Sequence, residues 1–81
     1  MNLLFYRYGS ICEQDIILAF QELGLQVDQI TVEITNKSIT PQEGIRIVSE
    51  YLYSRPTDFI FSINFYPFLS EVCNIFHIPY L

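Results

Sequence analysis

The sequence has few basic residues and few cysteines. Lysine and arginine number 4 against 9 acidic residues, a formal net charge of −5, and no stretch gathers the basic ones together. Because nucleic-acid binding needs clustered positive charge that neutralises phosphates, we expect no nucleic-acid partner. Cys12 and Cys73 are far apart and show no metal-ligand spacing. We therefore expect a cytoplasmic protein with reduced thiols, no metal, and no cofactor held by this chain.

The signals of secretion and of membrane insertion are also lacking. Residues 1–7 form a short apolar run without the basic start and small-residue cleavage site of a signal peptide. Residues 59–81 are nearly uncharged, but asparagine, histidine and proline interrupt them, so we expect no transmembrane segment. With 81 residues, 51% of them hydrophobic, the chain is predicted to form one small folded unit.

Segments of strand character alternate with segments of helical periodicity. Strands are predicted at residues 3–6, 27–32, 58–65 and, incompletely, 78–81. Helices are predicted at residues 11–23, 41–55 and 67–77. This alternation indicates parallel strands joined by crossover helices, so we predict an α/β fold: a Rossmann-like unit of three layers.

Local signals predict where the helices begin. Ser10 and Glu13 have the spacing of a capping box, in which a hydroxyl and a carboxylate each bond a free backbone amide. Thr40 and Glu43, with proline between them, give a stronger version of the same signal. Gly44 inside that helix costs about 1 kcal/mol relative to alanine. Such a cost predicts a close contact at this position.

The apolar content of the strands predicts their order. Residues 27–32 are the least apolar candidate and suit the edge of a sheet, whereas residues 58–65 suit its centre. The strand order is then 2-1-3-4, with a switch point between strands 1 and 3 and a truncated strand 4. Residues 1–81 are thus expected to form a partial Rossmann-like domain.

This order leaves the face of strands 3 and 4 beside the first helix uncovered. A large apolar patch seldom stays exposed to water, so we expect more chain or a second copy to cover it. The patch is expected to contain Phe59, Phe61, Ile63 and Phe65, or else the alternate residues Ile60 and Ser62.

Ligands of open parallel sheets bind beyond the carboxyl ends of the strands at the switch point. Gly9 allows close approach of a ligand to the backbone, and free amides at a helix start suit an anion or a sugar hydroxyl. No G-x-G-x-x-G or P-loop is present, so a dinucleotide or triphosphate is not expected. The candidate ligand residues are Tyr8, Gly9, Ser10, Glu13, Asn64 and Tyr66.

Each candidate also has a purely structural reading. Ser10 either contacts a ligand or only caps the helix, and Asn64 either contacts a ligand or holds its own loop. The tyrosines either stack on a sugar or base, or belong to the core. Arg7 pairs either with a phosphate or with Glu13 or Glu33.

Three segments together resemble the N-terminal domain of bacterial CgeB-like glycosyltransferases, a DUF3880 domain. These segments are Leu3–Glu13, Ile39–Glu43 and Phe59–Pro67. The chain is more loosely similar to the first Rossmann domain of GT-B glycosyltransferases, with residues 78–80 resembling a strand that starts with Ile-Pro-aromatic.

The resemblance implies transfer of a sugar from a nucleotide-sugar donor without a bound metal. In such enzymes the acceptor lies mostly against the N-terminal domain and the donor against the C-terminal one. The six candidate residues above would then be acceptor-side residues, with no catalytic residue established and Glu13 the best-placed base. The chain would be an inactive fragment whose partner is the missing C-terminal part or a second copy. The alternative is a free-standing dimerising interaction module without catalysis.

Overall fold

The computed structural model describes every residue from 1 to 81. Strands and helices alternate as the sequence predicts, with one additional short helix. The elements are β1 (Asn2–Tyr6), α1 (Glu13–Glu22), β2 (Gln26–Ile30), α2 (Val32–Thr35), α3 (Pro41–Ser54), β3 (Phe59–Phe61) and α4 (Pro67–Phe76).

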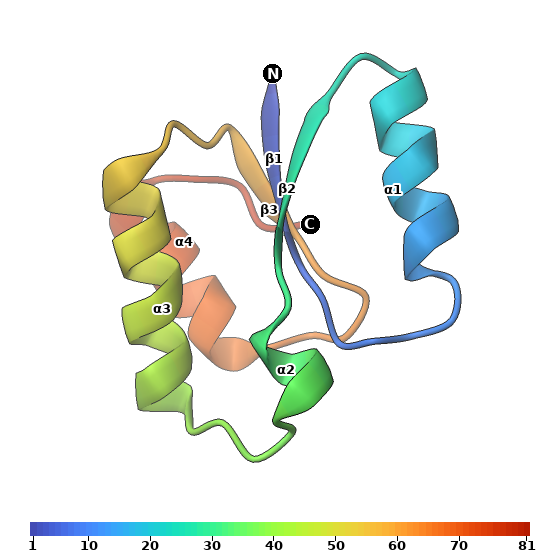
Figure 1. Ribbon diagram of the computed structural model, residues 1–81. Helices are drawn as coiled ribbons and strands as arrows, with labels where there is room; N and C mark the ends of the chain where they lie inside the picture. Colours follow the sequence, from blue (N-terminus) through green and yellow to red (C-terminus); the bar gives the residue numbers. More distant parts are fainter.

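The three strands form one parallel sheet in the order β2-β1-β3. α1 lies on one side of the sheet and the α3–α4 pair lies on the other, which gives three layers (Figure 1). The short α2 lies beyond the carboxyl ends of the strands, at the bottom of Figure 1. The α/β class, the parallel sheet and the 2-1-3 part of the strand order are confirmed. No helix has the length and apolar character that a membrane crossing requires.

The fourth strand predicted at residues 78–81 does not form. In its place a single parallel bridge joins Ile60 to Tyr80. Ile60 donates to the Pro79 carbonyl over 3.0 Å and accepts from the Leu81 amide over 2.8 Å. Because proline has no amide hydrogen, position 79 cannot continue this pairing towards Asp58.

β3 is also shorter than the predicted strand over residues 58–65. The chain turns after Phe61, and the Ser62 hydroxyl donates a hydrogen bond of 2.6 Å to the Asn64 carbonyl. The apolar run therefore supplies one short strand and the loop that follows it. β2 likewise ends at Ile30, short of the predicted strand end at residue 32, and residues 32–35 form α2, a helix that was not predicted.

Residues alternate along β1 between two apolar layers. Phe5 meets Phe61 edge-on, and Phe61 meets Phe20 of α1 in the same way, with ring centroids 5.1 and 5.3 Å apart. The larger layer joins the sheet to α3 and α4. Its buried members are Leu4, Tyr6, Ile30, Val48, Ile60, Phe68, Leu69, Val72 and Cys73.

The start of α3 matches its sequence signal. The Thr40 side chain accepts from the Glu43 amide and the Glu43 carboxylate accepts from the Thr40 amide, so the predicted capping box is confirmed. The close contact predicted at Gly44 is confirmed as well. A Cβ at this position would lie 2.6 Å from the Phe68 ring, so glycine lets α3 and α4 approach one another.

The start of α1 differs from its prediction. The helix begins at Glu13, its N-cap is Cys12, and no side chain caps it. The capping box predicted for Ser10 and Glu13 is therefore wrong. The helix ends as expected, because Gly24 follows its last turn with φ +90°.

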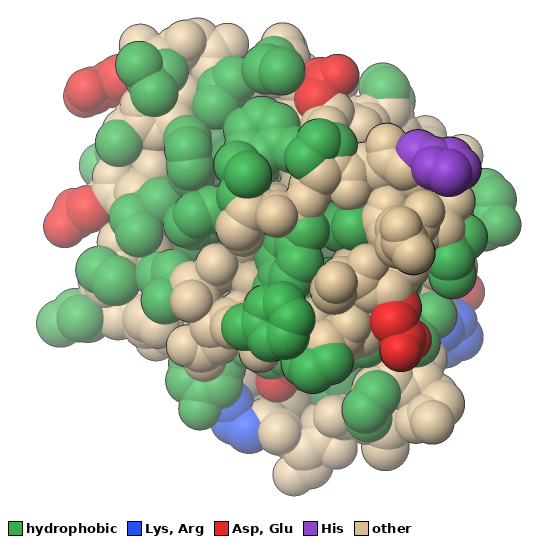
Figure 2. All heavy atoms as spheres, turned by 180° about the vertical axis from the view of Figure 1, so that it is seen from behind, with side chains coloured by type: hydrophobic (Ala, Val, Ile, Leu, Met, Phe, Trp, Pro, Cys, Tyr) green, Lys and Arg blue, Asp and Glu red, His purple; other side chains and the backbone are tan.

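Hydrophobic side chains gather on the face behind the view of Figure 1 (Figure 2). Phe65 is 71% exposed, and its ring stacks on Tyr80. Of the other residues expected on the uncovered face, Phe59, Phe61 and Ile63 are half-buried, while the alternates Ile60 and Ser62 are buried. That a partner covers this face stays a prediction.

Candidate functional site

The loop after β1 is organised around the carboxylate of Glu13. This side chain is fully buried, and it accepts hydrogen bonds from the amides of Tyr8 (2.8 Å) and Gly9 (2.9 Å) and from Arg7 Nε (3.1 Å). Gly9 has φ +103°, a conformation that glycine adopts readily and that turns two successive amides towards one acceptor. In Rossmann-like folds, the loop between the first strand and helix is where a phosphate binds. Here the chain's own carboxylate fills that position.

This arrangement corrects several expectations about the loop. The amides of Tyr8 and Gly9 are not free for an external anion, because Glu13 uses both. Glu13 is not a suitable base either, because both of its oxygens accept hydrogen bonds within the protein. Arg7 pairs with Glu13, as the structural reading of that residue predicts. The Ser10 side chain does not cap the helix, and only the backbone carbonyl of Ser10 accepts a bond, from the Glu13 amide over 3.3 Å.

A second carboxylate, Glu33, is buried at the same end of the sheet. α2 carries it, and it is only 6% exposed. The Tyr6 hydroxyl donates to Glu33 Oε2 over 2.9 Å. Burial, reinforced by this bond and by the charge of Glu33, raises the pKa of Tyr6. Tyr6 therefore stays protonated and acts as a donor to Glu33.

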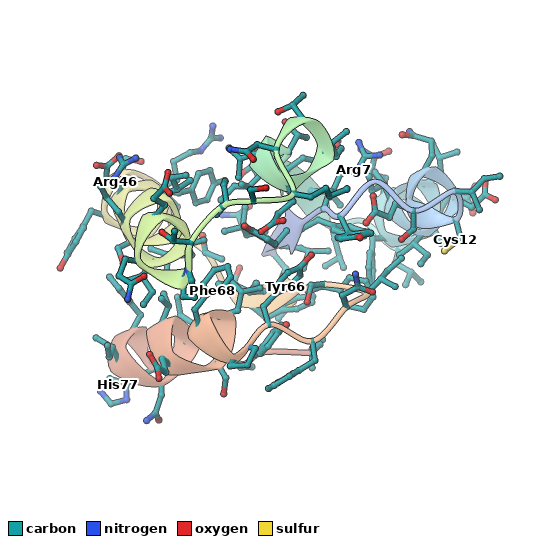
Figure 3. All side chains as sticks on the ribbon, turned by 90° about the horizontal axis from the view of Figure 1, so that it is seen from below. Arg7, Cys12, Arg46, Tyr66, Phe68 and His77 are labelled. Carbon is teal, nitrogen blue, oxygen red and sulfur yellow. The ribbon has the colours of Figure 1, made fainter.

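Tyr66 lies beside this pair. Figure 3 looks at this end of the molecule and shows Tyr66 near its centre, between α4 and the region of Arg7. Its ring meets the Tyr6 ring edge-on, with centroids 5.0 Å apart. Its hydroxyl is buried and has no hydrogen-bond partner. Burial and the charge of Glu33 raise the pKa of Tyr66 to about 12. The Asn64 side chain, which comes near the hydroxyl without reaching hydrogen-bond geometry, lowers this pKa by less.

Asn64 and Tyr8 lie nearer to solvent. Asn64 is exposed, and its backbone carbonyl, rather than its amide group, accepts the loop-closing bond from Ser62. Tyr8 is partly exposed, and the Lys37 ammonium lies 3.7 Å from the centre of its ring and donates to its backbone carbonyl. Of the six predicted residues, Tyr8, Gly9 and Glu13 are joined by hydrogen bonds, and Tyr66 belongs to a separate cluster with Tyr6 and Glu33.

The sequence reasoning missed Glu33 and Lys37 as members of this region. Both follow β2, whose carboxyl end lies beside that of β1 because the strands are parallel. The rule that ligand sites collect loops from neighbouring parallel strands therefore also applies to residues 31–39. The apolar–polar alternation of residues 27–32 hid this signal by extending the predicted strand past Ile30.

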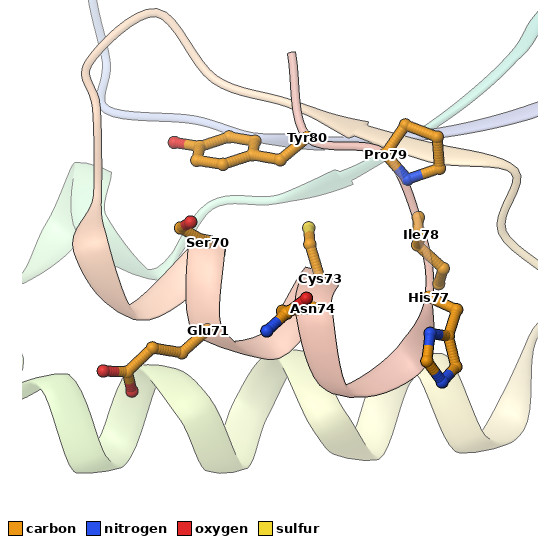
Figure 4. Close-up of a pocket in the computed structure, with 8 residues that line it drawn as sticks. All are labelled: Ser70, Glu71, Cys73, Asn74, His77, Ile78, Pro79 and Tyr80. Carbon is orange, nitrogen blue, oxygen red and sulfur yellow. The ribbon is translucent and has the colours of Figure 1, made fainter.

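The cavity of the structure lies elsewhere. It is an open groove of about 530 Å³ between α4 and the last residues of the chain (Figure 4). Burial raises the pKa of the Cys73 thiol beside it to about 11, which makes this thiol a poor nucleophile at neutral pH. No cluster of metal-ligating side chains is present here or elsewhere. The groove is lined by Ser70, Glu71, Cys73, Asn74, His77, Ile78, Pro79 and Tyr80.

Comparisons with protein-family models, with curated proteins and with solved structures give no match. The functional argument therefore rests on the geometry of this end of the sheet and on the resemblance noted in the sequence.

Proposed function

We propose that this chain supplies the acceptor side of a sugar-transfer site in a glycosyltransferase-like protein and is inactive alone. The observation that carries the proposal is the burial of Glu13 in the first strand–helix loop. With its amides used internally, the loop offers no cradle for the phosphates of a nucleotide-sugar. A domain of this kind suits the neutral acceptor, and the donor nucleotide would bind to another part of the protein.

Charge supports the same division of roles. Glu33 places a second buried carboxylate at this end of the sheet, and the chain as a whole has a net charge of −5. These charges would repel a diphosphate at this end of the sheet. The backbone amides of Tyr8 and Gly9, which could bind it, already donate to Glu13. A hydroxylated, uncharged ligand meets neither obstacle.

Saturation-transfer NMR with the 81-residue chain tests the proposal, because it detects weak binding. We expect a neutral methyl glycoside to receive saturation from the protein at millimolar concentration and UDP to receive none. The control is inorganic phosphate measured at the same ionic strength. It should not bind either. Binding of UDP to the loop after β1, with or without binding of a methyl glycoside, would refute the acceptor-side assignment.

A second candidate function is association through the outer edge of β3. Phe65 is 71% exposed and Leu81 63% exposed, and the edge of β3 is paired only through Ile60. Exposed apolar side chains beside an incompletely paired strand favour contact with another protein surface. Sedimentation equilibrium over a range of concentrations distinguishes the two candidates. A mass that stays at that of the monomer argues against the interaction module.

A further inference from the structure

Two buried polar groups at the carboxyl end of the sheet have unused hydrogen-bonding capacity. An ionised carboxylate offers about four acceptor positions, and the buried Glu33 receives a hydrogen bond from Tyr6 alone. The buried hydroxyl of Tyr66 has no partner. Folded proteins generally satisfy such groups, so a pair of them at one place calls for an explanation.

The two groups belong to one cluster, because Tyr6 contacts both residues. Tyr6 bonds Glu33 through its hydroxyl and contacts the Tyr66 ring edge-on. Both the carboxylate and the unpartnered hydroxyl therefore lie beyond the carboxyl end of β1, next to the switch point between β1 and β3. This is where open parallel sheets bind their ligands.

We propose that Glu33 and Tyr66 form a recognition pair for a hydroxyl group of the ligand. The ligand hydroxyl donates a hydrogen bond to the Glu33 carboxylate and accepts a hydrogen bond from the Tyr66 hydroxyl. The proposal deepens the proposed function and rests on it, because it names the chemical group by which an acceptor sugar would be held.

The chemistry of the pair selects a hydroxyl over other groups. A phosphate or carboxylate would bring a second negative charge against the buried carboxylate of Glu33. An ammonium group would pair with Glu33 but has no lone pair for the Tyr66 hydroxyl. A hydroxyl both donates and accepts, so it satisfies both residues at once.

Tyr8 and Lys37 make a surface contact at this end of the sheet. Lys37 reaches from the segment after α2 to contact the ring and the carbonyl of Tyr8. Residues 34–38, which span the end of α2 and the start of this segment, are all exposed. The cavity of the structure lies elsewhere, so a ligand reaches the recognition pair only if side chains at this end of the sheet move.

The test is to measure the affinity of the chain for methyl glucoside by amide shifts in ¹⁵N NMR, and to repeat it with Tyr66→Phe. Loss of one hydrogen bond predicts an affinity lower by about fivefold. The melting temperature of this variant should stay the same or rise, because the hydroxyl that is removed has no partner in the free protein. Tyr53→Phe, at an exposed position on α3, is the control and should change neither property.

Glu33→Gln provides a second variant that keeps the shape of the side chain. It should weaken binding of methyl glucoside while retaining a bond to Tyr6. Equal affinity of Tyr66→Phe and the wild-type chain would overturn the recognition pair, and so would a clear fall in the melting temperature of Tyr66→Phe.

The outcomes also separate the two proposals. If methyl glucoside shifts amides at this end of the sheet and Tyr66→Phe binds it equally well, only the recognition pair is wrong. If UDP binds at Gly9 while methyl glucoside still binds in a Tyr66-dependent way, only the acceptor-side assignment is wrong. If methyl glucoside shifts no amide near Tyr66 in the wild-type chain, both are refuted.

Discussion

Replacing Glu13 with alanine should destabilise the protein and open an anion site in the same step. The wild-type carboxylate is fully buried, and it accepts two backbone hydrogen bonds and one from Arg7. Removing one partner of a buried ion pair typically costs about 3–5 kcal/mol. Arg7 is partly exposed and can recover hydration, so we expect a loss near the lower end, about 3 kcal/mol.

This loss is large for a chain of 81 residues. Typical stabilities of about 0.05–0.15 kcal/mol per residue place the whole free energy of unfolding at about 4–12 kcal/mol. For a domain of this size each kcal/mol shifts the melting temperature by about 4–8 °C, so the variant should melt about 12–24 °C lower. Thermal unfolding followed by circular dichroism measures this shift directly.

The loop left by Glu13→Ala should then bind sulfate. The amides of Tyr8 and Gly9 and the Arg7 side chain would surround the site that the carboxylate filled. An anion present at one hundred times its Kd would restore about 2.7 kcal/mol. Sulfate also stabilises proteins in general, so the wild-type chain and Glu22→Ala, an exposed substitution at the end of α1, serve as controls.

Two results would refute this reasoning. One is a loss of stability below about 1 kcal/mol in Glu13→Ala, the range of an ordinary exposed substitution. The other is an equal rise in melting temperature with sulfate in Glu13→Ala and both controls. Glu13→Gln adds a test of cause, because it keeps the volume but sets an amide group against the backbone donors. It should lose most of the same stability.

Three further predictions follow from other parts of the fold. Gly44→Ala should destabilise by about 1–2 kcal/mol in urea unfolding, because the overlap with the Phe68 ring outweighs the helix propensity that alanine gains; an unchanged or higher midpoint would contradict the close contact. Stability should fall above pH 10, because the pKa of Tyr66 is about 12 in the folded protein and 10.0 unfolded; its contribution is complete below pH 10 and is lost between pH 10 and 12, so a flat alkaline limb would contradict it. Iodoacetamide should label the exposed Cys12 in the native chain and the buried Cys73 only after unfolding, as read by mass spectrometry; equal labelling rates would contradict the buried position of Cys73.

The features predicted correctly from the sequence are those set by local or compositional signals. The capping box at Thr40 and the glycine within α3 depend on a few neighbouring residues and on a side-chain volume. Signals of this kind act in the same way in most sequences. The 2-1-3 order is also as predicted. The apolar character of residues 58–65 indicated a central strand, however, and this was wrong: β1 is central, and β3 has only the Ile60–Tyr80 bridge on its outer side.

The candidate site was harder to predict, because its contacts join residues that are separated in the sequence. Tyr6 and Glu33 are 27 positions apart, and their hydrogen bond depends on the parallel pairing of β1 with β2. At Glu13 two physical effects compete for one side chain. The capping spacing favours Ser10, but two backbone amides and Arg7 together offer the carboxylate more hydrogen bonds. The spacing in the sequence does not show whether Glu13 forms a capping box with Ser10 or accepts hydrogen bonds from the loop.

The most direct test of the acceptor-side assignment is to follow the amides of Gly9 and Tyr66 in one ¹⁵N NMR spectrum. The sample is titrated first with methyl glucoside and then, separately, with UDP. We predict that methyl glucoside moves the Tyr66 amide and that UDP leaves the Gly9 amide unchanged, because Glu13 already holds it. Movement of the Gly9 amide with UDP, together with no response of Tyr66 to methyl glucoside, would contradict the assignment.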